Sequence, residues 1–211
     1  MACRNGFRYD RDHFRASRRC PRIRNPTTRG VVVLERSFGA PTVINSGVIE
    51  SPPMIKASIE KLGFKYADTK ILLISHAHFD HDAGSARIIK ETGAQYQVMD
   101  GDVDVVESGG KTDFAYGEDK DPDFARYPAA KVTRILHDRD TVRLGGTVLT
   151  AHKTAGHTKG CTTWTLKVNE GGKSLNVAIV GSPNVNPGFV LVGNKKYPGI
   201  AEDYEKTFRE L

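Results

Sequence analysis

The sequence predicts an α/β fold, and three observations support that prediction. The continuous apolar run KILLIS, residues 70–75, is typical of a strand that is buried on both faces. A helical segment ending at a glycine, residues 83–93, and a second strand, residues 94–99, follow it. Beyond residue 130, short apolar runs alternate with Gly and Asn turns. Strand–loop–helix–strand order followed by more strands indicates a layered α/β protein.

The elements before the buried run follow from local composition. Two short runs rich in β-branched residues, 30–35 and 41–45, predict strands. The segment SPPMIKASIEKLG, residues 51–63, predicts a helix with prolines in its first turn. Ser51 is placed to cap its start, and Gly63 to take the left-handed conformation at its end.

The later part of the chain reads as one short helix, one excursion, several strands and a final helix. Residues 100–110 predict a short helix, and the polar residues 111–130 predict an exposed excursion near the site. The expected strands and the last helix cover residues 132–136, 140–144, 147–153, 161–168, 175–181 and 197–211.

Charge divides the 211 residues into two parts. Residues 1–30 carry nine arginines against two aspartates, or +7, so residues 31–211 sum to −1 of the total +6. We expect residues 1–30 to be a disordered basic arm and residues 31–211 to be one domain. A basic arm can bind nucleic acid, but no aromatic interleaving supports such a partner. No run approaches the roughly 20 apolar residues of a membrane span, and no export signal is visible.

The stretch ISHAHFDHDAG places three of the seven histidines within six positions. The imidazoles of His76 and His78 can converge on one cation, and Asp80 and His81 suit a second cation nearby. Nitrogen and carboxylate donors favour zinc over iron or manganese. His157, in the glycine-bounded loop TAGHTKGC, is expected to complete the first site.

The spacing of these donors predicts a hydrolase. Zinc lowers the pKa of bound water to about 7, which makes hydroxide available to attack a carbonyl. The alternative is a structural zinc site, but such sites are usually closed and rich in cysteine. His137 and His152 lack a comparable setting and are interpreted as surface or structural residues.

The segment His76-Ala77-His78-Phe79-Asp80-His81 resembles the H-x-H-x-D-H signature of the metallo-β-lactamase superfamily. The resemblance implies an αβ/βα sandwich. It leaves the substrate open, because thioesterases, lactonases, RNA-processing nucleases and sulfatases share the signature. Most relatives carry a bridging aspartate where this chain has Ser182, and serine at that place resembles subclass B3. The resemblance covers about residues 42–211.

Roles carried over from the resemblance follow the matching positions. They imply a first zinc on His76, His78 and His157, and a second on Asp80 and His81, with Asp80 orienting the hydroxide that attacks a β-lactam carbonyl. Ser182 and Asn184 would lie near the substrate carboxylate. The alternative for these two is a turn that caps strand ends.

Two departures from the resemblance leave alternatives open. The family's second zinc takes a further histidine, and no histidine follows His157 here. The second half of the sandwich is therefore expected to be incomplete, and residues 1–41 do not match the family's start. The chain is expected to be a zinc β-lactamase, a relative that cleaves another ester, lactone or thioester, or an impaired fragment that binds one zinc. The resemblance implies a periplasmic or secreted protein. Oligomeric state is left open.

Overall fold

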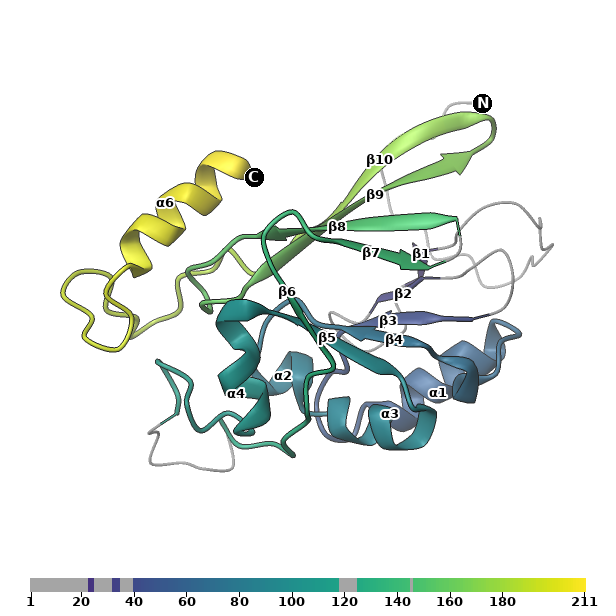
Figure 1. Cartoon of the computed structure of the whole chain (residues 1–211), viewed down its shortest axis with the longest axis horizontal. Helices are drawn as coiled ribbons and strands as arrows, with labels where there is room; N and C mark the ends of the chain where they lie inside the picture. The colour runs from purple at the N-terminus through teal and green to yellow at the C-terminus, as the bar shows by residue number, and fades with distance from the viewer. Residues whose placement is uncertain (1–22, 25–31, 35–39, 118–124, 145) are drawn as a thin grey trace.

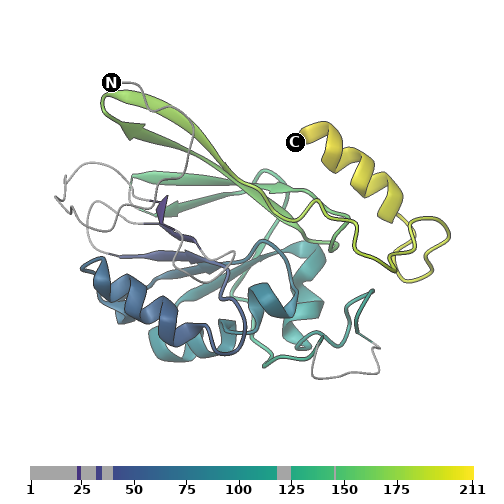
Figure 2. The same cartoon turned by 180° about the vertical axis from the view of Figure 1, so that it is seen from behind.

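The computed structural model describes residues 23–24, 32–34, 40–117, 125–144 and 146–211. In this part of the chain two sheets pack face to face, and helices α1 to α4 cover the outer face of the first sheet (Figure 1). The view from behind shows the same layers, with α6 beyond one end of the second sheet (Figure 2). The mixed α/β prediction and the sandwich implied by the resemblance are both confirmed.

The first sheet contains six strands among the described residues, in sequence order. Its first three strands pair antiparallel, and the next three continue from the third in parallel. The strands are β1 (Ile23–Arg24), β2 (Val32–Leu34), β3 (Thr42–Ile44), β4 (Ile71–Leu73), β5 (Gln95–Met99) and β6 (Arg134–Leu136). Parallel strands place their carboxyl ends at one edge of the sheet, where ligands usually bind.

The second sheet is antiparallel, in the order β10-β9-β8-β7. Its strands are β7 (Thr141–Leu144), β8 (Thr147–Lys153), β9 (Thr162–Glu170) and β10 (Lys173–Ile179). The helices are α1 (Pro52–Lys61), α2 (Phe79–Asp82), α3 (Ser85–Thr92), α4 (Val103–Glu107) and α6 (Ile200–Glu210), with 3₁₀ turns η1 (Tyr66–Asp68) and η2 (Asp100–Asp102).

Strand β4 shows why the buried run predicted a central strand. Leu72 packs under the helices with Ile55 and Ile59 of α1, whereas Leu73 faces the second sheet and packs near Trp164. All three residues of β4 are buried. Side chains that alternate between two apolar environments leave no polar face, and this explains the uninterrupted hydrophobic sequence.

Two expectations need correction. Asp80 and His81 lie in the short helix α2 rather than in a loop, whereas α3 falls within the helix expected at residues 83–93. The segment at residues 111–130 does lie near the site, but it is not simply exposed, because Asp113 and Tyr127 are buried in its described part. Both side chains face the metal-binding loops, which accounts for their burial.

The arm predicted for residues 1–30 lies largely outside the described residues. Of that stretch, the structure describes Ile23–Arg24, which pairs with Val33 and Leu34 as strand β1. Within the described ranges, every helix is too short or too polar to cross a lipid bilayer.

Candidate metal centre

Two loops at the carboxyl ends of β4 and β8 carry the candidate ligands. The first begins at Ser75, whose backbone N–H donates to Asn45 Oδ1 at 2.7 Å. Its carbonyl accepts from the backbone N–H of Thr162 at 2.7 Å, which joins this loop to the second sheet. Asn45 has a φ of 66°, a left-handed conformation that asparagine tolerates better than most residues. These bonds fix the point at which the metal-binding sequence begins.

The structure brings together the three histidines that the sequence placed at the first site. His76, His78 and His157, here called the histidine triad, are buried, and each offers a nitrogen within 4.8 Å of the other two. A second group with the same spacing consists of His76, Asp80 and His81. His76 belongs to both groups, so the two candidate positions are neighbours.

The tautomer of His157 follows from its hydrogen bond. Its Nδ1 lies 2.8 Å from the backbone carbonyl of Asn184. A carbonyl oxygen only accepts, so Nδ1 carries the proton and donates, and Nε2 keeps its lone pair. Metal-binding histidines are commonly fixed in this way by a partner on the other ring nitrogen.

His78 presents a second lone pair to the same point. Its Nε2 faces the buried Asp113 Oδ2 at 3.6 Å, and the negative charge favours the proton on that nitrogen. Its Nδ1 lies 3.1 Å from Nε2 of His157. Two lone pairs facing each other repel unless a cation lies near both, and ligands of a tetrahedral zinc are separated by about 3.3 Å. The triad therefore fits a zinc ion.

Ser75 contacts His76, the ring that both groups share, and His81, which belongs to the second group alone. Its Oγ lies 3.1 Å from Nδ1 of His76 and 3.2 Å from Nδ1 of His81. A hydroxyl oxygen has two lone pairs and can accept from both rings, which leaves both Nε2 atoms free for metal. The two rings lie 3.9 Å apart between centroids. One serine thus sets the spacing of the two candidate positions.

Burial keeps His76 and His157 of the triad neutral. Burial and the neighbouring imidazoles hold the pKa of His76 well below its usual value. Burial, together with the nearby His78, lowers the pKa of His157 to about 4. Neutral imidazole is the form that binds metal. Burial alone would raise the pKa of Asp80, but the hydrogen bond and charge of His81 hold it below its usual value, so Asp80 is an anion.

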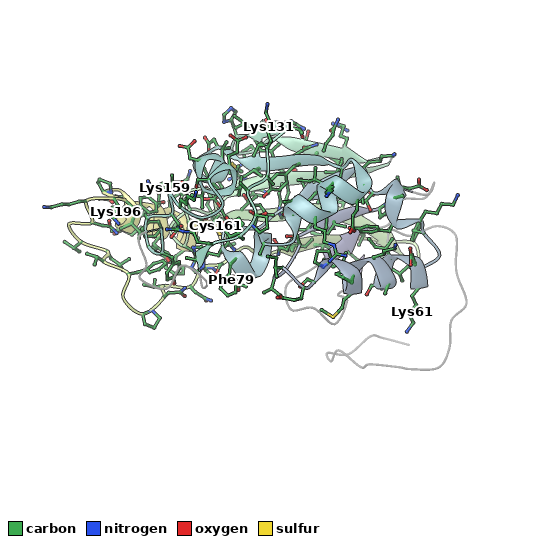
Figure 3. All side chains as sticks on the ribbon, turned by 90° about the horizontal axis from the view of Figure 1, so that it is seen from below. Lys61, Phe79, Lys131, Lys159, Cys161 and Lys196 are labelled. Atoms are coloured by element: carbon green, nitrogen blue, oxygen red, sulfur yellow. The ribbon has the colours of Figure 1, made fainter. Side chains whose placement is uncertain are left out.

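The candidate ligands border a cavity of about 220 Å³. Ser182 and Asn184, on the loop after β10, lie on its wall together with Tyr116. The side chain of Asn184 is exposed and that of Ser182 is half-buried. Figure 3 shows Phe79 of α2 and Cys161 beside β9 on the side of the molecule that carries Lys196, away from Lys61. The cavity therefore lies at one end of the sandwich, where the loops of both sheets meet.

His137 and His152 lie outside both groups. His152 contacts Arg139 and Thr165 through its two ring nitrogens, each at 2.7 Å, and His137 is exposed beside Asp100. The interpretation of both as surface or structural residues agrees with these contacts.

Sequence reasoning missed Asp102 and Asp113, the buried carboxylates beside the triad. Asp102 ends the 3₁₀ turn η2, which follows β5, and a polar residue just beyond the end of a parallel strand was a usable signal. Asp113 gave no such signal, because it lies in a polar stretch without periodicity.

Comparisons with known proteins agree with this geometry. The family profile of the metallo-β-lactamase superfamily matches residues 34–169. The chain therefore belongs to that superfamily.

Solved structures place it more narrowly, near subclass B3 enzymes. The native FEZ-1 metallo-β-lactamase from Legionella gormanii is 53% identical, with a TM-score of 0.82 over 86% of this chain and 68% of that one. BJP-1, a subclass B3 enzyme of Bradyrhizobium japonicum, is 42% identical, with a TM-score of 0.76 over 85% of this chain and 66% of that one.

The class B3 di-zinc enzyme LRA-12, from an Alaskan soil metagenome, is 34% identical, with a TM-score of 0.79 over 85% of this chain and 66% of that one. The chain thus spans about two thirds of the length of these relatives. By resemblance to them it is an enzyme.

Proposed function

We propose that this chain is a zinc-dependent hydrolase that opens the β-lactam ring of antibiotics. The observation that carries the proposal is the convergence of His78 Nδ1 and His157 Nε2, 3.1 Å apart, beside His76 and at the edge of a cavity. The β-lactamase relatives support the substrate class. A small molecule fits a cavity of about 220 Å³, which is narrow for a polymer.

The chemistry of the donors supports the metal positions that we propose. The histidine triad would hold a first zinc, and Asp80 with His81 would contribute to a second. When bound, zinc supplies hydroxide at neutral pH by lowering the pKa of water, and it polarises the carbonyl that is attacked. Three nitrogen ligands leave a coordination position open, as catalytic zinc sites do.

Asp80 is the residue we assign to proton handling. Its side chain is half exposed to the cavity, and its Oδ2 lies 3.4 Å from Nε2 of His81. Because Asp80 is an anion, it can orient the attacking water and accept its proton. Returning that proton to the ring nitrogen would complete the opening of the lactam.

Ser182 and Asn184 are proposed to contact the carboxylate of the substrate. The Ser182 backbone N–H donates to Cys161 Sγ at 3.2 Å, and the Asn184 carbonyl accepts from His157. These backbone bonds hold the loop in place while both side chains border the cavity. A hydroxyl and an amide there can donate to a carboxylate.

Location in the periplasm or outside the cell belongs to the same proposal, because β-lactam antibiotics act there and the relatives are β-lactamases. A role in antibiotic resistance would follow from it. The superfamily signature also supports hydrolysis of another cyclic amide or ester, so the substrate class needs a direct test.

The test is hydrolysis of a chromogenic cephalosporin by the 211-residue chain with added zinc. We expect turnover that a chelator abolishes and zinc restores. His157→Ala should remove both turnover and most tight zinc binding, whereas His152→Ala should keep both, because His152 lies outside the triad. Tight zinc binding without cephalosporin turnover would reject the β-lactam substrate and direct the search to esters and lactones.

A further inference from the structure

Asp102, at the carboxyl end of β5, contacts both loops that carry the histidine triad. Its Oδ2 accepts from the backbone N–H of Ala77 at 3.0 Å, and Ala77 lies inside the first loop. The same oxygen accepts from Thr158 Oγ1 at 2.8 Å, and Oδ1 accepts from the backbone N–H of Gly160 at 2.8 Å. Thr158 and Gly160 lie in the second loop. One carboxylate therefore connects segments more than 75 residues apart in sequence.

Helix capping does not explain this aspartate. Asp102 occupies the N-cap position of α4, where an aspartate normally accepts from the first backbone N–H groups of the helix. Here the side chain makes no such bond and turns toward the loops instead. The residue is 1% exposed, so its two oxygens depend on the three donors from the loops.

The backbones themselves touch at this point. A Cβ atom on Gly101 would lie 2.2 Å from the carbonyl oxygen of Lys159, and one on Gly160 would lie 2.5 Å from the backbone nitrogen of Asp102. Glycine is therefore required on both sides for the segments to approach. This backbone contact fixes the position of the second loop relative to the end of β5. The Asp102 carboxylate then links the second loop to the first loop through Ala77.

We propose that Asp102 is a positioning residue that sets the distance between the two halves of the metal centre, an inference that rests on the proposed zinc site. His76 and His78 flank Ala77, and His157 directly precedes Thr158, so two of the three hydrogen bonds end next to a ligand. Metal affinity depends strongly on ligand placement, and loss of a supporting hydrogen bond commonly lowers it 10- to 100-fold. Without the carboxylate, three buried donors lose their acceptor and the loops can separate.

The experiment compares zinc affinity, measured by competition with a chelator, for the wild-type chain and four variants. Asp102→Asn cannot accept from all three donors, and we expect it to weaken zinc binding about 10- to 100-fold. Thr158→Val removes one bond without changing side-chain volume and should weaken binding less, whereas Thr158→Ser keeps the hydroxyl and should restore affinity. Ile59→Val, in the core under the helices, should lower the melting temperature and leave zinc affinity unchanged.

The outcomes separate this inference from the proposed function. If the wild-type chain fails to bind zinc, the metal site and the role of Asp102 are both wrong. If the wild-type chain binds zinc and folded Asp102→Asn binds it equally well, only the positioning role is overturned. Should Asp102→Asn fail to fold, Thr158→Val decides: wild-type affinity in that variant overturns the inference, and weaker binding with rescue by Thr158→Ser supports it.

Discussion

At the scale of single residues, the pKa of His157 in the folded protein differs from that of an exposed histidine. His157 is 4% exposed, and burial with the nearby His78 lowers its pKa to about 4. In the unfolded chain the same imidazole titrates near 6.5. Between these two values the unfolded state binds a proton that the folded state does not. As pH falls through this window, unfolding becomes easier.

This difference gives a pH prediction for the zinc-free protein. His157→Gln removes the titrating ring, so wild type and variant should differ in their response to acid. From pH 7 to pH 4 the free energy of unfolding of wild type should fall relative to the variant by about 3 kcal/mol. Asp102 and Asp82, whose pKa values burial raises to about 6 and about 7, act in the opposite direction but are present in both proteins.

Denaturant unfolding with a chelator at several pH values measures the difference. Parallel curves for the two proteins would show that His157 titrates normally and is not desolvated in the folded state.

The candidate metal ligands could be predicted from sequence, and the residues that hold them in place could not. His76 was recognisable from the clustered histidines of the signature, and His157 from its glycine-bounded loop after a strand. Ser75 orients His76 and His81, yet nothing in the sequence distinguishes it from any other serine in a loop. The hydrogen bond between Asp102 and Thr158 joins positions 56 residues apart, and neither local sequence predicts it.

At the scale of elements, helix α6 holds the loop of His157 from outside. Tyr204 OH donates to the carbonyl of Asn184 at 2.5 Å, the same carbonyl that accepts from His157. Thr207 Oγ1 donates to the carbonyl of Ala155 at 2.8 Å. The Tyr204 ring lies directly against Gly156, where a Cβ would come within 2.7 Å of the ring. Placement of the His157 loop therefore depends on this helix.

Gly156→Ala tests that dependence. Gly156 has a φ of +131°, a conformation that L side chains rarely adopt, and a methyl group would also meet the Tyr204 ring. We expect a loss of about 1–3 kcal/mol of stability and weaker zinc binding, because the strain moves the loop or α6. Gly146→Ala is the matched control, since no heavy atom lies within 4 Å of its added Cβ. Thermal unfolding and chelator competition measure both effects, and equal results for the two variants would reject the packing argument.

Regular elements were predictable where one force dominated. Helix α1 was expected from its prolines and apolar spacing, and strand β4 from its unbroken hydrophobic run. Helix α2 was missed because Phe79–Asp82 is a single turn without its own periodicity, and its position follows from tertiary contacts. The polar composition of the segment containing Asp113 and Tyr127 predicted exposure. The structure buries both side chains against the site, and composition alone cannot reveal such burial.

At the scale of the whole molecule, the two candidate positions are unequal. The triad contains three buried imidazoles from two loops that are bonded to each other through Asp102. The neighbouring group shares His76 with the triad, so a zinc bound to the triad leaves Asp80 and His81 as the described ligands of a second ion. The Asp80 side chain is 52% exposed and therefore less fixed than the buried rings.

This inequality predicts two steps in a zinc titration of the 211-residue chain. A first zinc should bind tightly to the three ligands of the triad, as expected for a site with three protein nitrogens. A second should bind at least about tenfold more weakly, since two ligands hold it and one is partly solvated. Calorimetry against a competing chelator resolves the steps. Asp80→Asn should weaken only the second step, and His157→Ala should abolish the first. Two steps of equal affinity would mean that a further residue completes the second position, and that the asymmetry between the groups does not govern metal uptake.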